Sequence, residues 1–277
     1  MNFYDHNPDS TKPLIHLAHA NGFPPATYRL ALQRLYDHFH IVSLYARPFW
    51  PDCPPADTLK DWSVFSKDLI QGIELFAEKP IIAIGHSLGG VATIQAAVEH
   101  PELFSQVILM DPTMLPPSIL RKVWWMKLFG WEGRKELVEG ALRRRRHWES
   151  REQAFASFKG KSLFKKWPEE TFKAYVEGMT RENSKGGVDL AYSADWEAQI
   201  YRTIPTDVWK WVSKLQPPTL VVRGETSNTF MAESEEAFRK LRPQTTFAVV
   251  PGAGHLVAQE APIEVGQILL KFLQTSR

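Results

Sequence analysis

The chain has 277 residues and a formal net charge of +2, and its composition is 44% hydrophobic and 23% charged. This length is enough to bury a sizeable core, and so small a net charge gives no reason to expect a nucleic acid as partner. Cys53 is the only cysteine, which excludes an internal disulfide. The polar stretch 1–13 lacks the apolar run of a signal peptide, and no stretch reaches the ~18 apolar residues of a membrane span. We therefore expect a soluble, cytoplasmic protein.

Apolar runs alternate with helical patterns over the first part of the chain, which indicates a parallel sheet with crossover helices. The proline-rich loop 47–55 is too dense in proline to be helical. The expected order is strand 13–18, helix 27–36, strand 40–44, a helix beginning at Asp57 or Thr58, strand 80–84, helix 88–100 and strand 107–110.

The pattern changes beyond residue 117. Over residues 118–216 no run is typical of a strand, and the segment is charged, helical in pattern and rich in tryptophan. Strand patterns return at residues 219–222 and 246–250, and an amphipathic helix follows over 263–273. The simplest arrangement is one α/β core, residues 1–117 and 217–277, with a helical cap, residues 118–216, inserted between two adjacent strands.

A G-x-S-x-G motif at residues 85–89 lies between a predicted strand and a predicted helix. A serine that attacks a carbonyl must project from a sharp turn where the backbone is crowded, so small residues are needed on both sides of it. Gly85 and Gly89 supply that room. The strand before and the helix after distinguish the motif from a glycine-rich turn with an incidental serine. Ser87 is the predicted nucleophile, and the Leu88 N–H is the predicted oxyanion donor.

At these residues the chain resembles the α/β-hydrolase superfamily, over nearly its whole length outside the cap. The resemblance implies the α/β-hydrolase fold, a mostly parallel sheet with helices on both faces. Members place a second oxyanion donor in a His-Gly-x loop after an earlier strand, and the loop 19–25 occupies that position here, with Asn21 where the histidine is usual. The resemblance implies that the Phe23 N–H pairs with that of Leu88. We expect His19 to brace this loop through hydrogen bonds.

A histidine follows the last predicted strand, in the glycine-rich loop 251–255. A catalytic serine needs a neighbour with a pKa near neutrality to remove its proton and return it to the leaving group. His255 comes last in chain order, as the Ser-acid-His order of this fold requires. We predict that His255 is the general base.

The acid of the triad is ambiguous in the sequence. Most relatives carry it after the strand that follows the cap, but here that turn holds Glu225 close to the strand end, and Ser227 or Asn228 stands where the Asp is expected. An amide cannot supply the negative charge that the imidazole needs. Some members carry the acid after the strand that follows the nucleophile helix, where this chain has Asp111. We predict Asp111 as the acid, with Glu225 as the alternative.

The predicted cap is rich in aromatic and basic residues. Trp124, Trp125 and Trp131 lie in one short stretch, and we expect them to line the substrate pocket because the cap must cover the nucleophile. Residues 121–166 hold fourteen Lys or Arg against five Asp or Glu. A basic, aromatic rim would allow transient contact with a lipid surface or an acidic substrate. We interpret residues 143–146, four consecutive arginines, as a solvated helix face, because consecutive residues point around a helix.

Together these features predict a lipase-like serine esterase that works without cofactor or metal through Ser87, His255 and Asp111. The expected substrate is a small carboxylic ester with an apolar acyl or alcohol part. Three alternatives stay open: a C–C bond hydrolase, amidase or acyltransferase on the same triad; a ligand-binding receptor that hydrolyses slowly; and a catalytically inactive relative.

Overall fold

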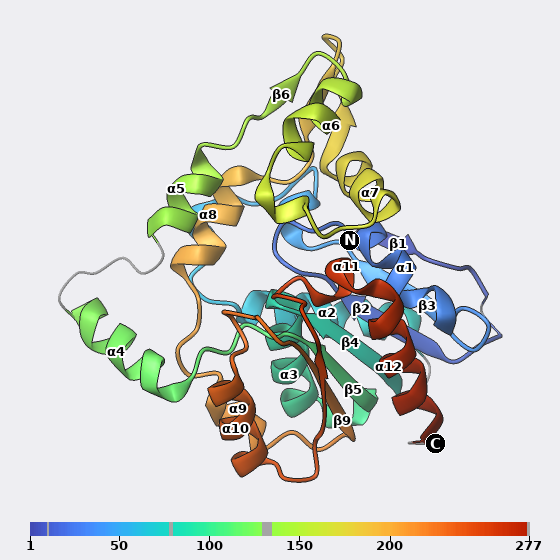
Figure 1. Cartoon of the computed structure of the whole chain (residues 1–277), viewed down its shortest axis with the longest axis vertical. Coiled ribbons are helices and arrows are strands. Elements are labelled where there is room, and N and C mark those ends of the chain that lie inside the picture. Colours follow the sequence, from blue (N-terminus) through green and yellow to red (C-terminus); the bar gives the residue numbers. More distant parts are fainter. Residues whose placement is uncertain (10, 78–79, 129–134, 276–277) are drawn as a thin grey trace.

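The computed structural model describes residues 1–9, 11–77, 80–128 and 135–275. Seven strands form one sheet in the order β1-β3-β2-β4-β5-β9-β10 (Figure 1). β1 runs antiparallel to β3, and the other neighbouring pairs are parallel. The predicted mostly parallel sheet is therefore confirmed. The strands are β1 (Phe3–Asp5), β2 (Leu14–Ala18), β3 (His40–Leu44), β4 (Ile81–His86), β5 (Phe104–Met110), β9 (Thr219–Gly224) and β10 (Thr246–Val250).

Helices cover both faces of this sheet, and the alternation along β4 shows how the two layers arise. Ala83 packs into the cluster that contains the apolar residues of α2 and α3. Ile84, its neighbour, packs into the cluster on the opposite face, with residues of α1 and α12. β4 is buried on both faces, as a central parallel strand is expected to be. The core helices are α1 (Arg29–Leu32), α2 (Ser63–Phe76), α3 (Leu88–Glu99), α10 (Ala232–Leu241), α11 (Val257–Glu260) and α12 (Pro262–Thr275).

Two helices of the core differ from the sequence-based expectation. The helix expected over residues 27–36 consists of three short pieces, of which α1 is the only α-helical one. The helix expected to begin at Asp57 or Thr58 begins instead at Ser63. The Asp61 carboxylate accepts the Ser63 N–H at 2.8 Å, so a later acidic residue supplies the start of α2.

The segment between β5 and β9 is mostly helical. Most of it lies above the core in Figure 1, but α4 extends to the side and α9 lies beside α10 of the core. The expectation of no strand in this segment was wrong, because β6, β8 and β7 form a small antiparallel sheet in that order. Each of these strands is two or three residues long, too short to show an alternating pattern. The elements are α4 (Pro117–Leu128), α5 (Lys135–Leu142), β6 (His147–Trp148), α6 (Arg151–Lys159), α7 (Glu169–Met179), β7 (Thr180–Glu182), β8 (Val188–Leu190), α8 (Ala194–Arg202) and α9 (Trp209–Val212).

The carboxyl ends of the parallel strands meet at one edge of the sheet, where open α/β sheets place their binding sites. The loops that follow β2, β4, β5, β9 and β10 therefore lie close together, and each carries one of the residues singled out above. Within the described part of the chain, no helix has the length and apolar character needed to span a bilayer.

Candidate active site

Ser87 occupies a strained turn between β4 and α3. Its φ and ψ are 56° and −115°, in the region with positive φ that few non-glycine residues adopt. A Cβ on Gly85 would lie 2.5 Å from the Gly89 carbonyl oxygen, and a Cβ on Gly89 would lie 2.1 Å from the Ala18 carbonyl oxygen. The turn thus requires glycine on both sides of the serine, as the motif predicts.

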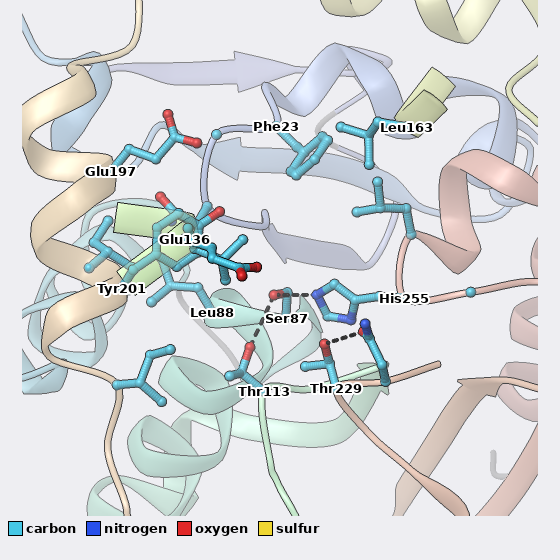
Figure 2. Close-up of a pocket in the computed structure, with 18 of the residues that line it drawn as sticks. Phe23, Ser87, Leu88, Thr113, Glu136, Leu163, Glu197, Tyr201, Thr229 and His255 are labelled. Carbon is cyan, nitrogen blue, oxygen red and sulfur yellow. Dashed lines mark hydrogen bonds between the residues drawn. The ribbon is translucent and has the colours of Figure 1, made fainter. Parts of the chain in front are cut away.

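A continuous chain of hydrogen bonds joins Ser87, His255 and Asp111. The Ser87 Oγ lies 2.8 Å from His255 Nε2, and His255 Nδ1 lies 2.7 Å from Asp111 Oδ1 (Figure 2 shows the first pair). The ionised carboxylate only accepts, so Nδ1 carries the proton and Nε2 accepts from the serine hydroxyl. This tautomer is the one that a general base for Ser87 requires.

Asp111 is fully buried at the end of β5, with φ of 41°. Besides His255, it accepts the Gly224 N–H at 3.0 Å and the Ser227 hydroxyl at 2.6 Å. The Phe230 N–H lies 3.4 Å from the same oxygen that Ser227 contacts. A buried carboxylate is tolerated only with such partners.

Two residues of the turn after β9 bear on the choice of the acid. Ser227 and Asn228 occupy the place where the acid is expected after this strand, and Ser227 donates its hydroxyl to Asp111. Glu225 is exposed, and its carboxylate accepts the Gly252 N–H at 2.8 Å. The structure therefore brings Asp111, and not Glu225, to His255. Asn228 is exposed and lines the pocket.

Thr113 is a residue that the sequence did not reveal. Its Oγ1 lies 3.1 Å from Ser87 Oγ, and both side chains are buried (Figure 2). Because the serine proton is directed to His255, Thr113 donates its own proton to Ser87 Oγ. Ser87 Oγ is thus held by two partners, Thr113 and His255.

The two predicted oxyanion donors are placed differently. Leu88 is the first residue of α3, so its N–H has no acceptor within the helix. The Phe23 N–H donates to the Ala20 carbonyl at 3.2 Å and closes a turn of the loop. Both residues line the same pocket as Ser87 (Figure 2).

The buried His86 connects the loop after β2, residues 19–25, to the loop of His255. His86 Nε2 faces the His255 carbonyl at 2.9 Å and must donate to it, so His86 Nδ1 accepts from the Tyr28 hydroxyl at 2.7 Å. The Tyr28 oxygen in turn accepts the Ala20 N–H at 2.9 Å. Burial, with the neighbouring His255 next in importance, lowers the pKa of His86 to about 3, which keeps it neutral.

His19 braces the loop after β2, as predicted. Its Nδ1 donates to the Ala20 carbonyl at 2.8 Å, and its Nε2 accepts the Ala46 N–H at 2.9 Å. Burial lowers the pKa of His19 to about 4. Neither nitrogen is left for acid–base chemistry.

A pocket of about 1030 Å³ opens over Ser87. Its apolar wall includes Phe23 and Trp62 from the core and Leu163 from the segment between β5 and β9. Of the tryptophans expected to line it, Trp131 lies outside the described residues, as do the side chains of Trp124 and Trp125.

The arginine run at residues 143–146 is not the solvated helix face that we expected. Helix α5 ends at Leu142, before the run begins. Arg143 and Arg146 are exposed in surface ion pairs, whereas Arg144 lies in the pocket wall and pairs with Glu197 at 2.6 Å. The run lies in the turn and loop that follow α5, and its members therefore have different partners and exposures.

Comparisons of the sequence with known proteins identify a family and several relatives. The chain matches the model of the "Alpha/beta hydrolase family" over residues 17–267. It is 26% identical over 255 residues to a 2-(acetamidomethylene)succinate hydrolase of Mesorhizobium japonicum, covering 90% of this chain and 84% of that protein. A shorter match, 39% identical over 61 residues, covers 21% of this chain and 20% of the monoglyceride lipase of Rattus norvegicus.

Solved structures share the fold at low sequence identity. The structure of E-2-(acetamidomethylene)succinate hydrolase superposes with a TM-score of 0.78 at 21% identity, over 98% of this chain and 94% of that one. The thioesterase domain from the curacin biosynthetic pathway gives a TM-score of 0.73 at 15% identity, over 97% of this chain and 94% of that one. With its family match over nearly the whole chain, this protein belongs to the alpha/beta hydrolase family.

Proposed function

We propose that this protein is a serine hydrolase of carboxylic esters, with Ser87 as nucleophile, His255 as general base and Asp111 as the acid. The observation that carries the proposal is the unbroken chain of hydrogen bonds, 2.8 Å and 2.7 Å long, from the serine to the buried carboxylate. Acyl transfer requires a nucleophile that projects from its turn and an imidazole whose Nε2 can accept the proton of the nucleophile, and the site has both.

The reaction proceeds in two steps. Ser87 attacks the ester carbonyl while His255 Nε2 takes its proton, and the proton then goes to the leaving alcohol. Asp111 accepts from Nδ1–H and stabilises the imidazolium that forms. The Leu88 N–H binds the oxyanion, and the Phe23 N–H joins it by turning from the Ala20 carbonyl. Water, activated by the same histidine, then releases the acid and restores Ser87.

The pocket favours an ester with an apolar part. Phe23, Leu163 and Ile200 line it, and residues 118–216, which we propose to be a cap, supply the last two of these side chains. Burial of such surface supplies most of the binding energy of small ligands. A relative that is named as a monoglyceride lipase is consistent with this class. Another relative is named for a substituted succinate, which makes an acidic substrate a second possibility to test.

The test is hydrolysis of p-nitrophenyl esters from acetate to palmitate by the wild type, Ser87→Ala, Asp111→Asn and Glu225→Gln. Ser87→Ala is expected to abolish turnover, and Asp111→Asn to reduce kcat by about 10³- to 10⁴-fold, because the wrong tautomer is then favoured. Glu225→Gln is the matched control: the exposed carboxylate contacts only a loop N–H among the described residues, so kcat should stay within about twofold.

Two outcomes would contradict the proposal. If Glu225→Gln is impaired as much as Asp111→Asn, Asp111 is not the specific acid of the triad. If the wild type is no faster than Ser87→Ala on every ester, the esterase function fails. Thermal stabilisation by a ligand without turnover would then favour a receptor, and turnover of carbon–carbon or amide bonds would favour the other hydrolases.

A further inference from the structure

Arg144 brings a cation into the pocket wall, a few ångströms from the loop that holds the proposed oxyanion donor. Its side chain is 13% exposed, and its partner Glu197 is 10% exposed. A Cβ built on Gly22, the residue before Phe23, would lie 3.6 Å from Arg144 Nη1 and 3.5 Å from Glu197 Oε1. The guanidinium therefore lies beside the site of the chemistry.

The guanidinium keeps hydrogen-bonding capacity for a ligand. Arginine has five N–H donors in a planar fork. Among the described residues, Arg144 uses two of them: Nη1 donates to Glu197 at 2.6 Å, and Nη2 donates to the Tyr175 hydroxyl at 3.0 Å. The remaining donors match the geometry of a carboxylate, which a fork of this kind binds with two parallel bonds.

A second cation lines the same pocket. The Lys161 ammonium lies 4.9 Å from the centre of the Phe158 ring, and no carboxylate of the described residues pairs with it. Burial lowers the pKa of Lys161 and the nearby Arg144 lowers it further, whereas Glu197 acts in the opposite direction. An anion bound between the two cations would relieve this repulsion.

Three carboxylates of the described residues also line the pocket, and their partners and exposure decide how strongly they would repel such an anion. Glu197 is paired with Arg144, and Glu260 lies 3.6 Å from the Lys166 ammonium and accepts the Gly254 N–H. Glu136, on α5, is exposed. Among the described residues, Glu197 is the carboxylate that forms an ion pair with Arg144.

We propose that Arg144, assisted by Lys161, binds a carboxylate of the substrate, so that the preferred substrates are monoesters of dicarboxylic acids. This inference rests on the proposed esterase function. Arg144 lies beside Gly22, the residue before the proposed oxyanion donor Phe23, and lines the same pocket as Ser87. We therefore expect a short chain between the carboxylate and the ester carbonyl of the substrate. The ester is cleaved as described above, with water supplying the hydroxyl of the new acid and the proton of the alcohol.

The experiment compares benzyl hydrogen succinate, glutarate and adipate with the benzyl esters of the matching monoamides, which have nearly the same size without the charge. Release of benzyl alcohol is followed by chromatography. For the best chain length, kcat/KM of the acid should exceed that of the amide by about 10- to 100-fold, as expected for hydrogen bonds to a charged group. Equal values for acid and amide at every chain length would overturn the inference.

The residue is tested with paired variants, because removing Arg144 alone leaves Glu197 buried without a partner. In Arg144→Gln/Glu197→Gln the acid-to-amide ratio should fall to near one. The matched control is Arg143→Gln/Glu139→Gln, which removes an ion pair of 3.0 Å from the same segment, where the side chains are 70% and 42% exposed. It should keep the wild-type ratio of acid to amide.

If the buried double variant does not fold, Arg144→Lys tests the planar fork of the guanidinium alone. This variant should lower the ratio about tenfold.

A binding experiment distinguishes failure of the proposed anion site from failure of the proposed esterase function. The catalytically blocked Ser87→Ala is titrated with benzyl hydrogen glutarate and with the amide ester in a calorimeter. Tighter binding of the acid with no turnover of any ester by the wild type would retain the anion site and refute the esterase. Equal binding of the two ligands, with turnover intact, would refute the anion site and leave the esterase standing.

Discussion

At the scale of single residues, the site depends on how Asp111 is held. The carboxylate is fully buried and receives hydrogen bonds from His255, from the Gly224 N–H and from the Ser227 hydroxyl. These donors balance the cost of burying a charge and keep the oxygen that faces the imidazole in place. Ser227 thus supports the proposed acid from the turn where other family members carry an acid of their own.

Replacing Ser227 with alanine should weaken catalysis without removing any member of the proposed triad. Loss of one hydrogen bond to a charged group predicts a fall in kcat of about 10- to 100-fold, with KM little changed. Ser105→Ala is the control, since that hydroxyl bonds the Ile81 carbonyl at the far end of β4. Steady-state kinetics on one ester measure both variants, and an unchanged kcat in Ser227→Ala would show that the backbone donors suffice.

At the scale of elements, the close approach of α3 to β2 sets the position of the nucleophile. Gly89, in the first turn of α3, passes so near the end of β2 that any side chain would meet the Ala18 carbonyl. The helix can therefore begin directly under Ser87 only if this residue lacks a Cβ. By contrast, Gly140 on α5 has no heavy atom of the described residues within 4 Å of an added Cβ.

These two glycines predict opposite effects of the same substitution. Gly89→Ala should lower the free energy of unfolding by about 3 kcal/mol or more and displace Ser87, because backbone atoms must move apart. Gly140→Ala should raise that free energy by up to about 1 kcal/mol, since alanine is the better helix former. Urea unfolding measures both, and a neutral Gly89→Ala would contradict the packing described for the turn.

At the scale of the whole molecule, three buried histidines, His16, His19 and His86, accept hydrogen bonds from other parts of the chain in the neutral form. Burial lowers the pKa of His16 and His86 to about 3 and that of His19 to about 4. His16 Nε2 accepts the Leu44 N–H at 3.0 Å, a bond that protonation would remove. The folded state thus stays unprotonated at these sites over a range of pH in which the unfolded chain takes up protons.

Stability should consequently fall as the pH drops below the ordinary histidine pKa of about 6.5. The unfolded chain binds the proton first, so each group lowers the free energy of unfolding by about 1.4 kcal/mol per pH unit until its folded pKa is reached. Denaturant titrations at pH 7, 6 and 5 measure this slope. His16→Gln should flatten it, whereas the exposed His38→Gln should leave it unchanged; equal slopes in both would show that His16 is not protected from protonation.

The local sequence determined the parts of this protein whose chemistry lies within a few adjacent residues. The central strand, the glycine-flanked turn of Ser87 and the loop of His255 could each be predicted because the signal is contiguous and the backbone has few alternatives there. The acid required a choice between Asp111 and Glu225, and the sequence resolved it only through the missing carboxylate at Asn228.

Only the tertiary structure decided which distant residues meet. Thr113 and the bridge from Tyr28 through His86 reach the site by packing across separate loops, and no spacing in the sequence indicates such contacts. The sequence marked Ser227 only as a place where an acid was expected, and its hydrogen bond to Asp111 became visible in the structure. Arg144 was hidden in a run of four arginines, and its burial depends on Glu197, more than fifty residues away. Side chains far apart in sequence are brought together by the burial of shared apolar surface, which is a property of the whole fold and not of any one segment.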